Sequence, residues 1–426
     1  MIKLPKETNK VIKELEAAGF ETYAVGGCVR DSLLGKVPTD WDIATAAQVE
    51  QVIAIVPGAK VFSEKFGVAR LEMEEITIDV ATFRIEGPYS DHRRPDQVEF
   101  TLSVLEDLKR RDFTINAIAD NPDRPVVDPF GGRDDIKGKL IKTVGEAEVR
   151  FEEDPLRMLR GIRLAAALDF ELHQSVKSAI QEKKHLIGGL SKERIRREFE
   201  KIMVGNNTGK GLRMLAALGI MQYIVGPERS EKMSRREIEN FNLVADNIDQ
   251  TMPVLERRLG VFYTIFDEAR ARKAFQVLEY DGDMEQKLMD AVLLTPQLCF
   301  LTNKYDMKKF LVRYGMERYD YLNNLSKAQR IVYHHDDARI MARIHILEDI
   351  KQYKEPIFIE DLAINGDDLL EAGIAQGEKI GNILMMLVDI VHMKPGLNTK
   401  KELLAYARQF SKSRLAASFR KMKWIK

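Results

Sequence analysis

The sequence predicts an α+β protein in which a mixed region of strands and helices is followed by an all-helical region. Short apolar runs such as TYAVGG, VARLEM and ITIDVATF are bounded by Gly, Pro or Asp and alternate with helical segments up to about residue 150. Beyond that position the apolar spacing is mostly helical, as at Ile195, Phe199, Ile202 and Met203, and strand-like runs are rare. At 426 residues the chain exceeds the usual limit for one core, so we expect about two to four domains.

The composition is that of an ordinary globular protein, with 45% hydrophobic and 31% charged residues, which excludes disorder over most of the chain. The two cysteines, Cys28 and Cys299, are too few for a disulfide framework and lack metal-ligand spacing, so we expect a reducing, cytoplasmic environment. The stretch MIKLPKETNK has no apolar signal region, and the longest apolar run, ILMMLVDIVHM, is short and interrupted by Asp389. We therefore expect neither secretion nor a membrane span.

The net charge is zero, which argues against a protein that simply coats nucleic acid. From Lys400 to Lys426, however, basic residues predominate and Glu402 is the only acid. This end could contact a polyanion or form a solvated terminal helix. Breaks between helices are expected at VGNNTGKG (204–211), at GPERSEK (226–232) and near LTPQ (294–297).

The segment DWDIAT predicts a strand with two carboxylates on one face. A period of two sends Asp40 and Asp42 to one side and Trp41 and Ile43 to the other, where they anchor the core. Adjacent carboxylates repel each other unless a cation lies between them, and oxygen ligands suit Mg²⁺. Asp79 in ITIDVATF offers a third acid from a neighbouring strand. Three acids can hold two metals roughly 4 Å apart, as in phosphoryl transfer.

Two glycines precede this strand in GGCVRDSLLG. Where glycines end a strand and open a helix, backbone N–H groups can approach phosphate oxygens closely. Gly26 and Gly27 fit this arrangement, and Arg30 and Lys36 could add positive charge. Alone, a Gly-Gly pair indicates only a turn and two spaced aspartates only a loop, but together they favour a nucleotide-binding site.

Five motifs in a fixed order over about the first 200 residues carry a resemblance to a known family. They are GGCVRDSLLG with DWDIAT, RRDFTINAIA (110–119), DPFGGRDDIKGKLIKTVG (128–145), EEDPLRMLRGIRLAAALDF and LSKERIRREFEKI. The chain resembles the class II tRNA nucleotidyltransferases, or CCA-adding enzymes, which belong to the DNA polymerase β type nucleotidyltransferases. The resemblance implies addition of C, C and A to the 3′ end of tRNA from CTP and ATP, without a nucleic-acid template. Two Mg²⁺ ions would assist in-line attack of the tRNA 3′-OH, with release of pyrophosphate.

The resemblance also implies the domain organisation and the partners. The expected domains are a polymerase β type head with a mixed sheet (1–150), then an all-helical neck (151–210), body (211–300) and tail (301–426). The expected partners are the 3′ end and elbow of tRNA, with CTP and ATP; no membrane and no protein partner is implied. Elbow contacts would come from the basic end, at Arg408, Lys412, Arg414 and Arg420.

An acid and an arginine can together recognise cytosine and adenine, because both bases present an amino donor beside a ring nitrogen acceptor. EEDPLR supplies such a pair. If Pro155 is the first helical residue, Asp154 is the N-cap and Arg157 lies one turn on, so both can face one base. The alternative is an ordinary capped helix with an ion pair. The resemblance assigns these two positions as the amino-acid template, with Glu153 supporting them.

In RRDFTINAIA the apolar residues Phe113, Ile115 and Ile118 are expected to be buried, and alone the stretch suggests a helix with a charged start. The residues left for polar contacts are Arg111, Asp112 and Asn116. The resemblance assigns Asp112, with Arg111, to the ribose 2′-OH and places Asn116 near the phosphates.

Arginines at positions 157, 160 and 163 share one helical face. Such a face is solvated in most proteins, but Arg160 and Arg163 could stack on a base or bind phosphate here. In LSKERIRREFEKI, Ser191 is the expected N-cap and residues 195, 199 and 202 the buried stripe. We interpret Arg194, Arg197 and Glu198 as residues that brace the template helix.

The polar segment RIEGPYSDHRRPDQVEF (84–100) is either a passive loop or, by resemblance, the flexible loop that CCA-adding enzymes use to switch from C to A. Its charged residues include Asp91, Arg93 and Arg94. YHHDD (333–337) contains His and Asp, but we expect a surface helix there rather than a metal site.

Other activities remain possible from the sequence. A CC-adding or A-adding enzyme shares the head, and so does a bacterial poly(A) polymerase, although that group usually carries a basic extension that we do not find. An inactive RNA-binding protein is a further alternative, against which the intact acids Asp40, Asp42 and Asp79 argue.

Overall fold

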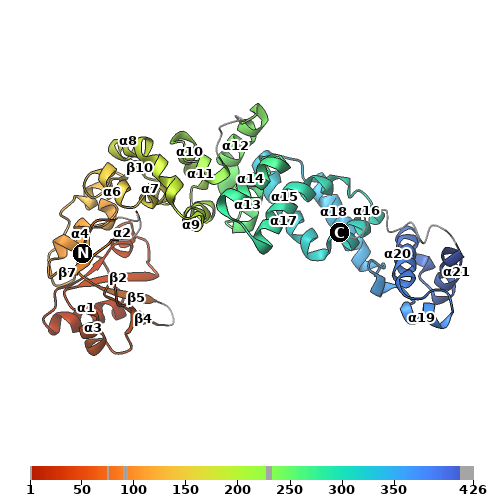
Figure 1. Cartoon of the computed structure of the whole chain (residues 1–426), viewed down its shortest axis with the longest axis horizontal. Helices are drawn as coiled ribbons and strands as arrows, with labels where there is room; N and C mark the ends of the chain where they lie inside the picture. Colours follow the sequence, from red (N-terminus) through yellow and green to blue (C-terminus); the bar gives the residue numbers. More distant parts are fainter. Residues whose placement is uncertain (1, 74–75, 90–91, 93–94, 227–232, 413–426) are drawn as a thin grey trace. The chain divides into compact units, whose positions relative to one another are not determined.

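The computed structural model covers the chain and describes residues 2–73, 76–89, 92, 95–226 and 233–412 (Figure 1). Its internal contacts define two compact units. The first comprises Met1–Lys232 with Gln276–Glu279, and the second comprises Met233–Phe275 with Tyr280–Lys426. The expected α+β class is confirmed, because the strands lie in the first part of the chain and helices follow.

The first unit begins with a six-stranded mixed sheet in the order β3-β4-β5-β2-β1-β8. Strands β2 and β5 are parallel, and the other neighbours are antiparallel. The predicted strands in all three apolar runs and in DWDIAT are therefore confirmed. The strands are β1 (Thr22–Val25), β2 (Asp40–Thr45), β3 (Lys60–Ser63), β4 (Val68–Glu72), β5 (Thr77–Thr82) and β8 (Ala119–Asp120).

Alternating burial along β2 and β5 fixes the faces of this sheet. Trp41, Ile43, Ile78 and Val80 are all buried, whereas the residues between them are partly or largely exposed on the two strands. The helices around the sheet are α1 (Lys6–Ala17), α2 (Gly27–Leu33), α3 (Val49–Ile55), α4 (Val104–Lys109), the 3₁₀ turn η1 (Thr114–Asn116) and α5 (Gly132–Lys137). Helices α1 and α3 contact strands of the sheet.

Two small sheets complete the strands. In the polar segment 84–100, β6 (Arg84–Glu86) pairs antiparallel with β7 (Val98–Phe100). The two ends of this predicted loop therefore form a β-hairpin. Strand β9 (Leu140–Ile141) pairs in parallel with β10 (Glu171–Leu172).

The helical part of the first unit comprises α6 (Ala147–Glu153), α7 (Leu156–Leu168), α8 (Gln174–Lys183), η2 (Lys184–Gly189), α9 (Lys192–Val204), α10 (Thr208–Ala217) and α11 (Gln222–Val225). In this part, α7 is contacted by α6, α9 and α10. The predicted stripe of Ile195, Phe199 and Ile202 on α9 is buried, and Ser191 occupies the N-cap position, although its side chain makes no capping hydrogen bond.

The second unit is helical throughout its described residues. Its elements are α12 (Arg235–Asn247), η3 (Ile248–Gln250), α13 (Leu255–Tyr263), most of α14 (Glu268–Leu278), α15 (Gly282–Leu294), η4 (Thr295–Phe300), α16 (Lys304–Tyr314), α17 (Met316–Tyr333), α18 (Ala338–Gln352), η5 (Ile359–Asp361), α19 (Gly366–Glu371), α20 (Glu378–Met393), η6 (Pro395–Leu397) and α21 (Lys400–Lys412). Two apolar cores hold it together, one around Leu311 and Leu322 and one around Leu387 and Leu403. Each helix in the described part of the chain is too short or too polar to traverse a bilayer.

Several expected boundaries can be compared with these elements. The break at 204–211 is the short turn between α9 and α10, and the break near 294–297 is the change from α15 to η4. Beyond Gly226, the break at 226–232 lies outside the described residues. The domain limits at 150 and 210 fall inside α6 and α10, and those boundaries remain predictions. In YHHDD, residues 334–337 form an exposed turn between α17 and α18, so the predicted surface position is right but the predicted helix is wrong.

Candidate active site

Two carboxylates meet at the centre of the first sheet. Asp42 on β2 is the direct register partner of Asp79 on β5, and the parallel pairing places both side chains on one face. Asp40 lies on that face two residues before Asp42, next to Thr77 of β5. The predicted grouping of these three acids on adjacent strands agrees with this register.

Asp79 has a partner that the sequence analysis did not identify. Arg70 of β4 donates two hydrogen bonds to its carboxylate, at 2.7 Å from Nε and 2.8 Å from Nη2. The Arg70 guanidinium also stacks on Phe62, 3.6 Å from the ring centroid. The signal was present in VARLEM, because a cationic residue on a strand next to an acidic strand indicates a cross-strand pair.

The electrostatics of Asp42 favour a cation. Loss of hydration raises the pKa of Asp42, and repulsion from Asp79 and Asp40 adds to the increase, while Arg111 opposes it. Within the described residues, no group of three or more His, Cys, Asp or Glu side chains has the geometry of a metal cluster. The carboxylate oxygens of Asp40 and Asp42 suit Mg²⁺ in their chemistry, whereas Asp79 is engaged with Arg70.

The Gly-Gly pair adopts the predicted strand-to-helix turn. Strand β1 ends at Val25, Gly26 has φ +82°, and α2 begins at Gly27. A Cβ at Gly26 would lie 3.0 Å from Nη1 of Arg111 and 3.3 Å from Oδ2 of Asp42. A side chain at this position would therefore separate Asp42 from Arg111.

Arg30 of α2 faces the second motif. It pairs with Asp31 at 2.9 Å and donates a hydrogen bond to Oδ1 of Asn116 at 2.6 Å. Asn116 in turn donates to Asp112 at 3.1 Å. Lys36 is exposed after the end of α2 and joins none of these contacts in the structure.

The RRDFTINAIA segment forms the short turn η1 and the start of β8, not the helix expected from the segment alone, while Phe113, Ile115 and Ile118 are buried as predicted. Asp112 accepts hydrogen bonds from the Phe113 N–H at 2.8 Å, from Asn116, and from Arg160 at 2.6 and 3.0 Å. Burial alone would raise the pKa of Asp112, but Arg160 and these hydrogen bonds outweigh it and lower the pKa to about 2. The carboxylate is thus held ionised.

Asp107 of α4 is a buried carboxylate that sequence analysis missed. It accepts hydrogen bonds from Arg110 at 2.7 and 2.9 Å, from Arg111 at 3.2 Å and from the Arg84 N–H at 3.3 Å. Burial acts to raise its pKa, but the two arginines lower it overall. The spacing of three and four residues from Asp107 to the two arginines is the signal that could have revealed this anchor.

The junction between α6 and α7 differs by one residue from the prediction. Helix α7 begins at Leu156, and Pro155 occupies the N-cap position. Pro155 has helical dihedral angles and lacks an N–H group, so it can precede the helix without leaving a donor unpaired. Asp154, the expected N-cap, ends α6 but still accepts a hydrogen bond from the Leu156 N–H at 3.1 Å. It also accepts two from Arg194 of α9, at 3.0 and 3.1 Å.

The arginine face of α7 is paired with acids rather than solvated. Arg157 is buried and binds Glu153 of α6, Arg160 binds Asp112, and Arg163 binds the buried Glu198 of α9 at 2.6 Å. Glu153, Arg194 and Glu198 thus contact the residues they were expected to support. Arg197 does not: it is largely exposed and pairs with Glu193 of its own helix at 2.6 Å, so the structure does not place it among the braces of α7.

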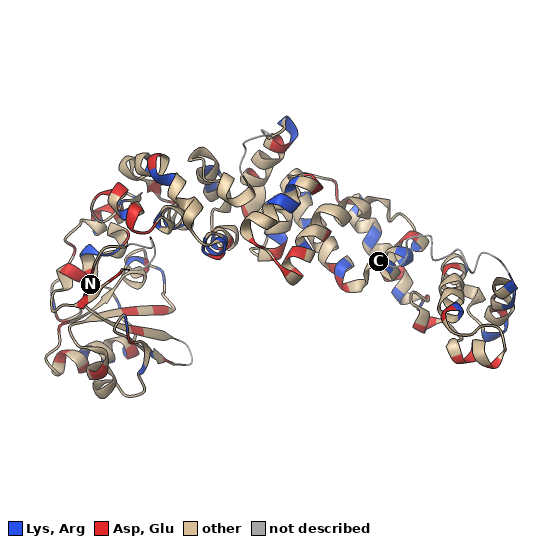
Figure 2. Ribbon diagram, in the orientation of Figure 1, with Lys and Arg blue, Asp and Glu red and all other residues tan. Residues whose placement is uncertain are grey.

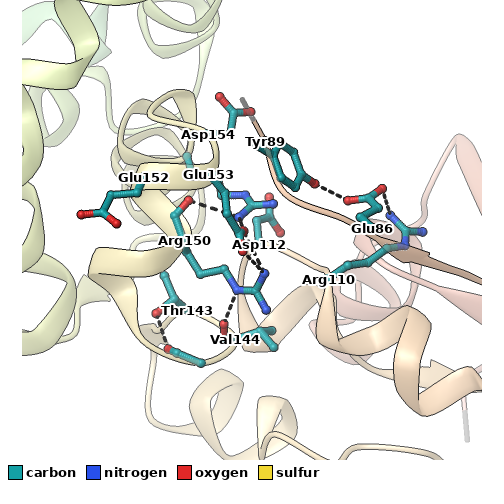
Figure 3. A network of polar contacts seen from close by, with 12 residues as sticks. Glu86, Tyr89, Arg110, Asp112, Thr143, Val144, Arg150, Glu152, Glu153 and Asp154 are labelled. Atoms are coloured by element: carbon teal, nitrogen blue, oxygen red, sulfur yellow. Dashed lines mark hydrogen bonds and ion pairs between the residues drawn. The ribbon is translucent and has the colours of Figure 1, made fainter. Parts of the chain in front are cut away.

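The β6–β7 hairpin reaches the same junction. Figure 3 shows Tyr89 pointing its hydroxyl toward Glu86, to which it donates a hydrogen bond. Glu86 is nearly buried and also binds Arg84 at 2.8 Å and Arg110 at 3.2 Å. The Arg157 guanidinium lies 5.8 Å from the Tyr89 ring centroid. The other predicted loop residues, Asp91, Arg93 and Arg94, lie outside the described residues.

A pocket of about 420 Å³ opens beside the two carboxylates. Its wall contains both acids, two aromatic rings and three arginines. The lining residues are Val25, Asp42, Ile43, Phe62, Ser63, Phe66, Val68, Asp79, Ala81, Arg84, Arg110 and Arg111. Asp154 and Arg157 do not line it.

The basic end is represented by α21, where Figure 2 shows the Lys and Arg residues in blue. Arg408 and Lys412 are exposed on this helix. Arg414 and Arg420 lie outside the described residues.

Two family models match the chain. The model for the poly A polymerase head domain matches residues 22–142, and the model for a probable RNA- and SrmB-binding site of polymerase A matches residues 169–233. Similar proteins named CCA-adding enzyme include one from Leuconostoc mesenteroides, 31% identical with 96% of this chain and 98% of that protein covered. Another from Lactiplantibacillus plantarum is 32% identical with 97% and 99% covered.

The alignments to other relatives are shorter. That to the CCA-adding enzyme of Geobacillus thermodenitrificans is 43% identical but covers 53% of this chain and 56% of that protein, so it spans about half of each. Among solved structures, the Bacillus stearothermophilus CCA-adding enzyme in complex with CTP matches with a TM-score of 0.76 and 28% identity, over 97% of this chain and 98% of that one. The Thermotoga maritima CCA-adding enzyme complexed with tRNA matches with a TM-score of 0.63 over 95% and 96% of the chains; at 22% identity it shows the shared fold.

Proposed function

The chain belongs to the CCA-adding enzymes, and from this premise we propose that it adds C, C and A in turn to the 3′ end of tRNA. The substrates are CTP, ATP and a tRNA that lacks its end, and pyrophosphate is released. The observation that carries the proposal is the register pair Asp42 and Asp79 in the same unit as the acid and arginine of the α6–α7 junction. One unit thus holds residues for phosphoryl transfer and residues for selecting a base.

Base selection rests on Asp154 and Arg157. The Asp154 carboxylate accepts a hydrogen bond from the exocyclic amino group of cytosine or adenine, and the Arg157 guanidinium donates one to the adjacent ring nitrogen. The pairs with Arg194 and Glu153 support this role, because they fix the orientation of both side chains before a nucleotide arrives. Uracil and guanine present a carbonyl and an N–H there, so they meet the wrong partners.

Ribose selection rests on Asp112. Its carboxylate is held ionised by Arg160, Asn116 and the Phe113 N–H, which suits it to accept a hydrogen bond from the 2′-OH of a ribonucleotide. Gly26 and Gly27 leave room for the triphosphate beside Arg111 and Arg30. Arg163 supports α7 through its pair with Glu198.

Asp40 and Asp42 would hold Mg²⁺, which when bound neutralises charge on the phosphates and lowers the pKa of the attacking hydroxyl. Asp79 lies beside Asp42 and can accept the proton that the tRNA 3′-OH loses as it attacks the α-phosphorus. Arg70 fixes the orientation of the Asp79 carboxylate through two hydrogen bonds.

The elbow of tRNA would be bound by the basic end, through the exposed Arg408 and Lys412 of α21 together with Arg414 and Arg420. A tRNA substrate fits the cytoplasmic location expected from the scarcity of cysteine.

The test is primer extension on a tRNA transcript that lacks CCA, with CTP, ATP and Mg²⁺. We expect a product three nucleotides longer, no product after chelation of the metal, and no product from Asp42→Asn, whose tRNA binding should persist. A product that stops at two nucleotides would indicate a CC-adding enzyme. Long tails made from ATP alone on an unrelated RNA would indicate a poly(A) polymerase, and either result would overturn the proposal.

A further inference from the structure

Phe62 is placed unusually for a large aromatic residue. It lies on β3, the edge strand of the six-stranded sheet, and 57% of its surface is exposed. The register between β3 and β4 is irregular between Val61 and Ser63, so the residue between them, Phe62, sits at a bulge. Bulges at sheet edges redirect side chains and are common beside active sites.

The ring is also held at a defined position relative to the carboxylates. The Arg70 guanidinium packs over it at 3.6 Å from the centroid, and the same guanidinium makes the bidentate contact with Asp79. Phe62, Arg70 and Asp79 thus form one connected group, and both Phe62 and Asp79 line the 420 Å³ pocket.

The pocket suits a nucleoside better than a triphosphate. Two of its wall residues are carboxylates, and its three arginines are already bound to Glu86 or Asp107, so little positive charge remains for four phosphate charges. An aromatic wall beside carboxylates instead offers a stacking surface for a base and acceptors for ribose hydroxyls. The volume lies within the range of about 300–1,000 Å³ typical of small-ligand pockets.

The pocket borders the proposed position of the triphosphate at Arg111, but it does not include the residues proposed to select the base. The residues proposed to select the base and the ribose, Asp154, Arg157 and Asp112, are not part of its wall. Attacking and leaving oxygens lie roughly in line across the phosphorus, so the attacking 3′-OH must approach opposite the leaving pyrophosphate, within reach of the metal held by Asp42. The wall of the pocket contains Asp42 together with Asp79 and Phe62, so a nucleoside bound there would have its 3′-OH close to both carboxylates.

We propose that this pocket binds the 3′-terminal nucleoside of the RNA strand, with its base stacked on Phe62 and its 3′-OH directed to Asp79. The inference rests on the proposed function, because it assigns the site of the strand being extended. Phe62 is a positioning residue here: it orients the terminal base, and Arg70 orients both Phe62 and Asp79.

The experiment compares Phe62→Ala, Phe62→Trp and the control Val61→Ala in the full chain. Val61 neighbours Phe62 on β3 and is similarly exposed, at 54%, but does not line the pocket. We expect Phe62→Ala to raise the KM for tRNA lacking CCA by roughly fivefold to a hundredfold, since one base loses its stacking partner. The KM for CTP should stay within about twofold, Phe62→Trp should restore the wild-type value, and Val61→Ala should have no effect.

A second readout reports stacking directly. A tRNA transcript whose last base is 2-aminopurine should lose fluorescence on binding the wild-type chain and the Phe62→Trp variant, but not on binding Phe62→Ala. An increase in the KM for CTP instead of tRNA would place the incoming nucleotide in the pocket and overturn the inference. Wild-type kinetics and a wild-type loss of fluorescence on binding Phe62→Ala would also overturn it. In that case CCA addition by the wild-type chain still stands, so the two failures are distinguishable.

Discussion

Asp42 of β2 and Asp79 of β5 stand opposite each other in register on parallel strands, yet only Asp79 is bound by an arginine of a neighbouring strand, Arg70. The two acids therefore differ in what they can do. We expect Asp42 to bind a cation together with Asp40, whereas Asp79 is held in one orientation by Arg70 and is proposed to face the attacking hydroxyl. The two aspartates thus have different proposed roles, metal binding for Asp42 and proton acceptance for Asp79, although the sequence alone does not distinguish them.

The approach of Asp42 to Arg111 depends on Gly26, and a matched glycine allows this to be tested. Gly26 and Gly35 both have positive φ, at +82° and +73°, but a Cβ at Gly35 meets no atom within 4 Å. We expect Gly26→Ala and Gly35→Ala each to lower the free energy of unfolding by about 1–3 kcal/mol, because both strain the backbone. Only Gly26→Ala should also lower kcat for CTP incorporation. Equal kcat values in the two variants would show that the close contact at Gly26 is not needed.

Arg157 is expected to govern the choice of base. Arg157→Ala should reduce the ratio of kcat/KM for CTP over UTP by about tenfold, because it removes one of the two hydrogen bonds by which Asp154 and Arg157 together recognise the base edge, a pair that contributes roughly 1–3 kcal/mol of discrimination. The control is Arg197→Ala, which removes an exposed arginine paired within α9 and should leave the ratio unchanged. Steady-state kinetics with CTP, ATP and UTP measure these kcat/KM ratios. If the ratios in Arg157→Ala match the wild type, the base is selected by other residues.

Asp112 links stability to pH. Its pKa is about 2 in the folded chain, below the ordinary value near 3.9, so it stabilises the fold above pH 4 and this contribution disappears as the pH falls toward 2. We expect Asp112→Asn to lose about 2 kcal/mol of stability at pH 6, with the difference from wild type shrinking between about pH 4 and pH 2. Urea unfolding monitored across this range tests the prediction, with Asp134→Asn as an exposed control. A difference independent of pH would contradict the assignment.

The hairpin segment is expected to control the step from C to A. Tyr89 contacts both Glu86 and Arg157, so a change in the segment alters the residue proposed to hold the base. We expect replacement of residues 88–96 by a short Gly linker to leave addition of both cytidines but stop before adenosine, which appears on a gel as a two-nucleotide product. Tyr89→Phe, which keeps the ring and removes the hydrogen bond, should slow only the last step. Normal A addition by the shortened chain would make the segment passive.

The strands and the carboxylates could be predicted because their signals are local. Period-two alternation around Trp41 and Ile43 fixes the face of Asp40 and Asp42, and no distant residue can reverse it. Contacts between separate strands and helices could not be predicted in the same way. Arg70, Glu86 and Asp107 belong to the site through strand pairing and burial, which a single sequence does not display.

Two predictions, for Arg197 and for YHHDD, differ from the structure because of where a helix ends or which way its side chains face. From the sequence, Arg194 and Arg197 are both expected to brace the template helix, but Arg194 pairs with Asp154, whereas Arg197 is largely exposed and pairs with Glu193 of its own helix. In YHHDD, the left-handed conformation of His334 ends α17, and the histidines and aspartates that follow occupy a turn. The sequence around YHHDD predicted that these residues are exposed, but it did not predict that α17 ends at Tyr333.

The acid partners of the α7 arginines limit how related sequences can diverge. Loss of Arg160 leaves the Asp112 carboxylate, whose side chain is only 12% exposed, without its cationic partner, and a compensating exchange at position 112 would relieve that cost. We therefore expect positions 112 and 160 to covary among homologues, and likewise positions 163 and 198, because a change in one partner of each ion pair favours a matching change in the other. Arg197, whose ion pair is exposed and weak, should drift independently of them.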